Sequence, residues 1–154
     1  MTNKQTTLEL MLLIVSISIF IFLSPLLTGS KHPAIEASVK QNMDFLNEMV
    51  KKYIEKHKHP PENMDVLVTD ARNNRYNKTF FNPILKNTDD AINRQIVENY
   101  SSAIYQSLNE NFQGLQYAGK IGYFQSGLQY AIYGHTEEGK LLRQDNQILV
   151  LSNQ

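Results

Sequence analysis

The chain has 154 residues, with 15 basic and 15 acidic side chains, a formal net charge of zero and no cysteine. Zero net charge disfavours nucleic acid as a partner, because no net positive field attracts a phosphate backbone. The lack of cysteine excludes disulfide frameworks, thiol catalysis and thiolate zinc sites.

The first predicted element is an apolar segment that starts at Leu10 and continues to Leu27. It is roughly 18 residues long, about the length that crosses a bilayer as a helix. We therefore expect residues 1–28 to form a short tail and a transmembrane helix. Three interpretations are open, namely a cleaved secretory signal, an ordinary signal anchor and the assembly helix of a filament subunit. The length of the segment disfavours the cleaved signal.

The residues around the start of this segment carry a family resemblance. Residues 5–15 read Gln-Thr-Thr-Leu-Glu-Leu-Met-Leu-Leu-Ile-Val, which resembles the start of mature type IV pilins and type II secretion pseudopilins. The resemblance implies that Glu9, followed by Leu10, is the acid that guides docking into a filament. It also implies that Pro25 is the proline that bends the helix in this family.

The resemblance implies partners as well as a fold. They are other pilin-like subunits, the assembly machinery of the inner membrane, the lipid bilayer and prepilin peptidase. The filament is a type IV pilus, a competence filament or a type II secretion pseudopilus. By the same resemblance, the protein is a single-pass protein of the cytoplasmic membrane. Its amino terminus is then cytoplasmic and its carboxy-terminal domain extracytoplasmic.

The processing junction departs from the family pattern. Prepilin peptidase cuts after a glycine, whereas Lys4 stands at that position and Gln5 replaces the usual aromatic first residue. Two functions therefore stay open. The first is a processed filament subunit, and the second is an unprocessed, membrane-anchored binding or sensor module. Without cleavage, Glu9 has to pair with Lys4, stay near the interface or take up a proton.

Residues 29–154 are expected to form one pilin-like globular domain that begins with a long helix over 34–58. Apolar residues recur at steps of three and four, and charged residues lie between them. Mixed charge on the polar face favours a core helix over a membrane-surface helix. The apolar stripe comprises Ile35, Val39, Met43, Leu46, Val50, Tyr53 and Ile54.

The region 60–113 is predicted to hold short and variable elements. Residues 61–68 suggest a brief helix, and Phe80–Ile84 resemble the family's loop of an aromatic residue, Asn-Pro and an apolar residue. A capping pattern at residues 87–90 predicts a second helix that reaches Phe112. Apolar and aromatic residues recur there at steps of four, namely Ile92, Ile96, Tyr100, Ile104 and Leu108. The resemblance implies that the variable residues 88–113 determine partner choice.

Residues 116–152 read as an antiparallel β-meander. The expected strands are 117–124, 128–133, 140–143 and 147–151, separated by Gly- and Asp-containing turns. The order of motifs from Gly119 to Leu141 is similar to that of pilin-like domains. The predicted fold class is therefore α+β, with the long helix packed on a small antiparallel meander.

No residue pattern indicates catalysis, a metal or a cofactor. His57 and His59 lie two residues apart at a helix end, with no acid beside them in the sequence, so a solvated helix terminus is expected. The adjacent acids of Asp89–Asp90 and of Glu137–Glu138 diverge, which is unsuitable for acid–base work. Oxygen ligands for calcium from Glu137, Glu138 and Asp145 are considered, but hairpin solvation is preferred. We expect a protein that is not an enzyme.

Overall fold

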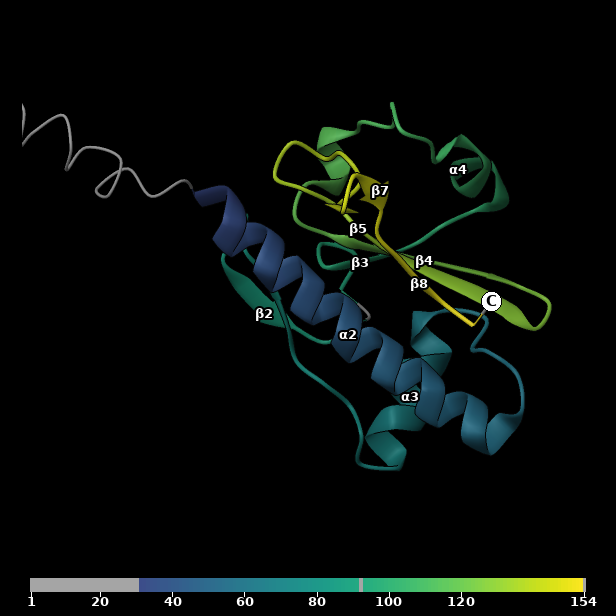
Figure 1. Ribbon diagram of the computed structural model, residues 1–154. Coiled ribbons are helices and arrows are strands. Elements are labelled where there is room, and N and C mark those ends of the chain that lie inside the picture. Colours follow the sequence, from purple (N-terminus) through teal and green to yellow (C-terminus); the bar gives the residue numbers. More distant parts are fainter. Residues whose placement is uncertain (1–30, 92, 154) are drawn as a thin grey trace, which may run out of the picture. The chain divides into compact units, whose positions relative to one another are not determined.

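The computed structural model describes residues 31–91 and 93–153, which form an α+β fold (Figure 1). The expected transmembrane segment and its boundary with the globular domain lie outside the described residues. The helices are α2 (Lys31–His57), α3 (Met64–Asn73), α4 (Ser102–Ser107) and the 3₁₀ turn η1 (Leu115–Tyr117). The strands are β1 (Phe80–Asn82), β2 (Asn87–Asp89), β3 (Val97–Asn99), β4 (Ile121–Ser126), β5 (Gln129–Gly134), β6 (Arg143–Gln144), β7 (Gln147–Ile148) and β8 (Val150–Ser152).

Helix α2 is the longest described element, and its apolar stripe lies in the core as predicted. Val39, Leu46 and Val50 have no exposed surface, and Tyr53 is only 5% exposed. Their spacing of three and four residues places them on one side of a helix, which is the side that packs on the sheet. The helix ends at His57, where Lys58 takes a positive φ of 67°. Within the described part of the chain, no helix is long and apolar enough to cross a membrane.

Helix α3 confirms the brief helix expected after the proline pair and extends it. Asn63 caps its first turn, since the side-chain oxygen accepts a hydrogen bond from the amide of Val66 at 3.0 Å. Four apolar residues of α3 are buried in the same core as α2, namely Met64, Leu67, Val68 and Ala71. Helix α3 therefore covers the carboxyl-terminal part of α2.

The second long helix predicted from residue 87 to Phe112 is wrong. Residues 87–89 instead pair with β1 as strand β2, and residues 97–99 form β3, so α4 is the only helix among the described residues of this region. The side chains between these strands bond to their own backbone: Asp89 accepts from the amide of Asp90 and Asn93 from that of Gln95. Such local bonds compete with helix formation, and the four-residue apolar spacing did not reveal them.

The main sheet has the strand order β3-β4-β5-β8 and is mixed rather than purely antiparallel. Strands β4, β5 and β8 are antiparallel, which confirms most of the predicted meander, but β3 runs parallel to β4. The strand expected at residues 140–143 is only partly formed: Lys140 and Leu141 make isolated β-bridges to Gln113 and His135, and Arg143 begins the small β6–β7 hairpin. Asp145 and Asn146 make its turn with positive φ angles.

The parallel pairing of β3 with β4 determines how the sheet is covered. Parallel neighbours need a long crossover connection, and here residues 100–120 supply it. This connection contains α4 and η1, and Tyr105 of α4 stacks on Phe124 of β4. The sheet thus has two different faces, which we call the inner face (toward α2) and the outer face (toward α4).

The inner face is the centre of the core. Its large side chains are at most 2% exposed, and the hydroxyl of Tyr130 donates a 2.7 Å hydrogen bond to Asn47 of α2. A Cβ placed on Gly134 of β5 would meet Met43 at 2.7 Å and Val39 at 2.9 Å, which shows how closely α2 approaches. The inner-face side chains are Ile121, Tyr123, Tyr130 and Ile132.

Candidate functional site

The residues predicted to act in assembly and processing lie outside the described part of the chain. They are Lys4, Gln5, Glu9, Leu10 and Pro25. The structure therefore describes the body that accompanies these residues.

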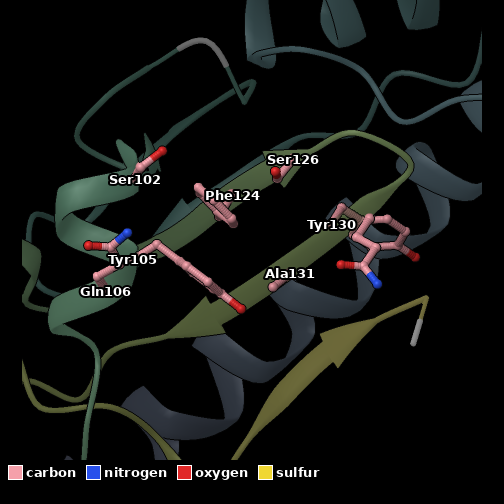
Figure 2. Close-up of a pocket in the computed structure, with 8 residues that line it drawn as sticks. Ser102, Tyr105, Gln106, Phe124, Ser126, Tyr130 and Ala131 are labelled. Atoms are coloured by element: carbon pink, nitrogen blue, oxygen red, sulfur yellow. The ribbon is translucent and has the colours of Figure 1, made fainter.

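The described body carries a hollow of about 290 Å³ on its outer face, between α4 and the β4–β5 hairpin (Figure 2). We call it the outer groove. Helix α4 contributes one wall, and the two strands form the floor and the opposite wall. It is lined by Ser102, Tyr105, Gln106, Phe124, Ser126, Gln129, Tyr130 and Ala131.

The aromatic part of the outer groove is held by stacking. The rings of Tyr105 and Phe124 have centroids 3.9 Å apart, with their planes 7° from parallel. Tyr133 of β5 makes an edge contact with Tyr105. Burial, and the nearby Tyr105 hydroxyl, raise the pKa of Tyr133 to about 12. Helix α4 itself is capped by Ser101, whose hydroxyl accepts from the amide of Ile104. The ring of Tyr105 is therefore held by Phe124 and by Tyr133.

The polar part of the outer groove consists of uncharged groups. Ser102 and Gln106 come from α4, and Ser126 and Gln129 come from the two ends of the hairpin turn. Hydroxyl and amide groups both donate and accept hydrogen bonds, but none of them acts as a general base or holds a hard cation alone. The arrangement offers hydrogen-bond donors and acceptors to a ligand.

Ser102, Tyr105 and Gln106 were not identified from the sequence, although a signal exists. Their spacing of three and four residues places them on one side of a helix. The predicted helix includes these three residues, but the prediction rests on its apolar side and not on the side that carries Ser102, Tyr105 and Gln106.

A second hollow, of about 420 Å³, lies where α2 ends against α3 and contains a tightly held carboxylate. Asp70 receives hydrogen bonds from Lys56 at 2.7 Å and from the Tyr76 hydroxyl at 2.5 Å, and it lies 3.0 Å from His57 Nε2. Burial alone raises the pKa of Asp70, but these hydrogen bonds outweigh it and lower the pKa to about 2. Asp70 is therefore a permanently ionised structural anchor between the two helices.

This arrangement corrects the expected surroundings of the histidine pair. His57 is not simply solvated, because Asp70, thirteen positions later in the chain, lies beside it. Its ring also stacks on Tyr53 with centroids 4.2 Å apart. His59 instead contacts the carbonyl of Pro60 at 2.9 Å, and its ring centroid lies 6.2 Å from that of His57.

His135 is fully buried among aromatic side chains on the outer face. It contacts the Tyr100 hydroxyl through Nε2, and its ring stacks on Tyr117 with centroids 5.2 Å apart. Burial lowers the pKa of His135 to about 4, so the imidazole is neutral at pH 7. It is a buried polar group that stabilises the packing around Gly122 and Tyr100.

The adjacent acids also have structural partners. Asp90 pairs with Arg72 of α3, and Glu138 pairs with Lys140 in the turn that follows β5. Among residues 31–91 and 93–153, no three His, Cys, Asp or Glu side chains are grouped in a way that could hold a metal ion. Glu137, Glu138 and Asp145 are accordingly not brought together as a calcium site.

The chain was compared with known proteins. No protein-family model, curated protein or solved structure matches it.

Proposed function

We propose that this chain is a pilin-like structural subunit. Its apolar amino-terminal helix packs with like helices in a type IV pilus, a competence filament or a type II secretion pseudopilus. In this proposal the chain is held in the cytoplasmic membrane with the described body outside. Glu9 and Leu10 form the docking point, and Pro25 bends the helix.

The observation that carries the proposal is helix α2 and the way the sheet is attached to it. Helix α2 has 27 residues and starts at Lys31. In the sequence, only residues 28–30 separate it from the apolar run that ends at Leu27. One side of α2 forms the core with the sheet, while residues such as Lys40, Asp44 and Lys51 keep the other side exposed. A helix of this kind suits a spine that carries a small domain on one side.

The Asn-Pro loop adds support from a different part of the chain. The Asn42 amide of α2 donates to the carbonyl of Phe81 at 2.7 Å and accepts from the amide of Phe81 at 3.2 Å. Asn82 is fully buried, and its side-chain oxygen accepts from the amides of Ile84 and Leu85. These bonds tie the loop that resembles the family's motif directly to α2.

A filament preparation tests the proposal. We expect the full chain to be found in the sheared filament fraction of its host, and the Glu9→Ala variant to be lost from that fraction while it remains in the membrane. Asp44→Ala is the matched control, since it removes an exposed acid from α2 and should assemble normally. The proposal fails if Glu9→Ala enters filaments at the level of the unmodified chain.

The second candidate is an unprocessed, membrane-anchored binding or sensor module with the same body. Lys4 at the processing position favours it. Mass spectrometry of the membrane-extracted chain separates the two functions. A start at Gln5, with or without a methyl group, supports the subunit. An intact amino terminus in a chain that is absent from filaments supports the module.

A further inference from the structure

We propose that the outer groove binds a neutral saccharide, with one sugar ring seated against Tyr105. This binding is separate from the proposed role in assembly, because every residue that forms the groove belongs to the described body. The argument rests on three properties of the groove, namely its charge, its size and the groups around its aromatic pair.

The groove carries no charge of its own. None of its eight lining residues is acidic or basic. A charged ligand would lose part of its hydration there without meeting an opposite charge, which is costly. The groove therefore selects against phosphates, sulfates, uronic acids and amines, and it favours an uncharged ligand.

The size of the groove favours a small ring. Pockets for small molecules usually measure about 300–1,000 Å³, and the outer groove, at about 290 Å³, lies just below that range. A nucleotide or a large cofactor needs more room. A single sugar ring, with further units extending into solvent, is compatible with a hollow that has exposed side chains in its lining.

The walls combine the two kinds of contact that a sugar ring offers. The C–H face of a sugar ring is attracted to the electron-rich face of an aromatic ring. Stacking on Phe124 holds the aromatic ring of Tyr105 in place before a ligand binds, so that side chain loses little conformational entropy on binding.

The hydroxyl edge of a sugar needs groups that donate and accept hydrogen bonds in turn. Ser102, Gln106, Ser126 and Gln129 provide them from both walls (Figure 2 shows Ser102, Gln106 and Ser126). All four side chains are exposed, and within residues 31–91 and 93–153 none of them hydrogen-bonds another group of the protein. They are placed to bond a ligand without first giving up an internal partner.

Saturation-transfer NMR on the full chain tests this proposal. The chain is held in polyoxyethylene detergent micelles, because detergents with sugar headgroups would compete. The probes are three neutral trisaccharides, namely those of glucose in α-1,4 linkage, of glucose in β-1,4 linkage and of N-acetylglucosamine. We expect at least one to receive saturation, with a dissociation constant of roughly millimolar size, as suits one ring and a few hydrogen bonds.

Variants locate the binding. Gln106→Ala and Gln129→Ala remove exposed side chains and should each weaken binding by about tenfold, the effect of one or two hydrogen bonds. Gln116→Ala removes an exposed glutamine from η1, outside the groove, and should leave binding unchanged. Tyr105→Leu should abolish the transfer. If that variant does not fold, the two glutamine variants still decide the matter.

Three results would overturn the proposal. The first is that none of the three neutral trisaccharides receives saturation. The second is that trigalacturonate, a charged trisaccharide, binds as well as the neutral ones. The third is that an uncharged tetrapeptide binds in their place with the same dependence on Gln106. Because the assay is done in micelles, its failure leaves the filament result unaffected, and the reverse also holds.

Discussion

The two faces of the central sheet are built from the same two strands but differ in what covers them. The inner face meets a 27-residue helix, and its side chains are at most 2% exposed. The outer face meets a six-residue helix and a crossover, which cover its Gly122 end and leave the hairpin end open. Alternation along β4 and β5 thus sends alternate residues to the inner face and to the outer face, and only the hairpin end of the outer face is open.

The difference in burial between the two faces indicates where amino-acid substitutions are tolerated without loss of folding. The inner face holds the domain together, so altered residues there affect folding first. The hairpin end of the outer face contributes little to the core, so its side chains are free to serve recognition. The buried end of the outer face, around Tyr100 and His135, lies between these extremes. Four perturbations test this comparison, and they are given from the largest expected effect to the smallest.

Leu46→Ala tests the inner face. Leu46 has no exposed surface and lies in the middle of the buried side of α2, so its removal leaves a cavity. We expect a loss of about 4 kcal/mol in the free energy of unfolding. The measurement is urea unfolding of the full chain in micelles, followed by near-ultraviolet circular dichroism. All 8 tyrosines of the chain lie in the described body, so this signal reports on it.

Lys51→Ala is the control for that measurement, since it removes an exposed side chain from the same helix. It should change the free energy of unfolding by less than about 0.5 kcal/mol. If the two variants lost the same free energy of unfolding, the buried side of α2 would not be part of the hydrophobic core.

Acid tests the buried end of the outer face. The imidazole of His135 has a pKa lowered by burial to about 4, against 6.5 in the unfolded chain. The unfolded chain therefore takes up a proton that the folded chain refuses. The contribution of His135 to stability is complete above pH 6.5 and declines as the pH falls toward 4. The slope is about 1.4 kcal/mol per pH unit, which amounts to about 3 kcal/mol over the window.

Urea unfolding at a series of pH values measures this slope. His135→Gln should flatten it between pH 6.5 and 4.5, whereas His57→Gln should leave it in place. Asp70 does not interfere, because hydrogen bonds hold its pKa at about 2 and its contribution is lost only below the unfolded value of 3.8. A slope that survives His135→Gln would assign the acid sensitivity to other groups.

Gly122→Ala tests how closely the crossover approaches the sheet. A Cβ on Gly122 would lie 1.9 Å from Cζ of Tyr100, whose ring is buried and held by His135. Because the ring has no room to move, we expect a loss of about 2 kcal/mol in thermal or urea unfolding. Gly127→Ala is the comparison: a Cβ there meets no atom within 4 Å, so only its φ of 59° costs energy, about 1 kcal/mol. The reverse order would contradict this packing.

Tyr105→Ala tests the open end of the outer face. Its stacking on Phe124 is partly exposed, so we expect a loss of only about 1 kcal/mol in unfolding free energy. Tyr123→Ala, an aromatic truncation on the inner face, should cost about 3 kcal/mol or more, because Tyr123 is 1% exposed and bonds the carbonyl of Pro61 at 2.7 Å. Similar costs for the two would erase the distinction between the faces.

Much of the fold was predictable from local patterns. The stripe from Val39 to Tyr53 repeats with the period of a helix, and the break at His59-Pro60-Pro61 ends it within a residue of the observed end. The hairpin of β4 and β5 followed from two β-rich runs around Ser126-Gly127, where Gly127 adopts the positive φ that such a turn needs. In both cases the physical cause acts between near neighbours in the chain.

The errors arose where strand pairing prevailed over the spacing of apolar residues. Residues 87–89 become a strand because the nearby β1 pairs with them in a hairpin, and Val97 begins a strand because the distant Ile121 lies beside it. Neither pairing leaves a trace in the spacing of apolar residues, which alone favoured a helix. The outer groove was missed for the same reason, since it exists only where the crossover returns over the sheet.

The sequence alone specified that the chain has an apolar amino-terminal run followed by an amphipathic helix and a β-rich end, because hydrophobic periodicity and turn residues are local properties. The tertiary structure decided the parallel pairing of β3, the burial of His135, the ionised state of Asp70 and the outer groove. Each of these depends on groups that are far apart in the chain and are brought together only when the core forms.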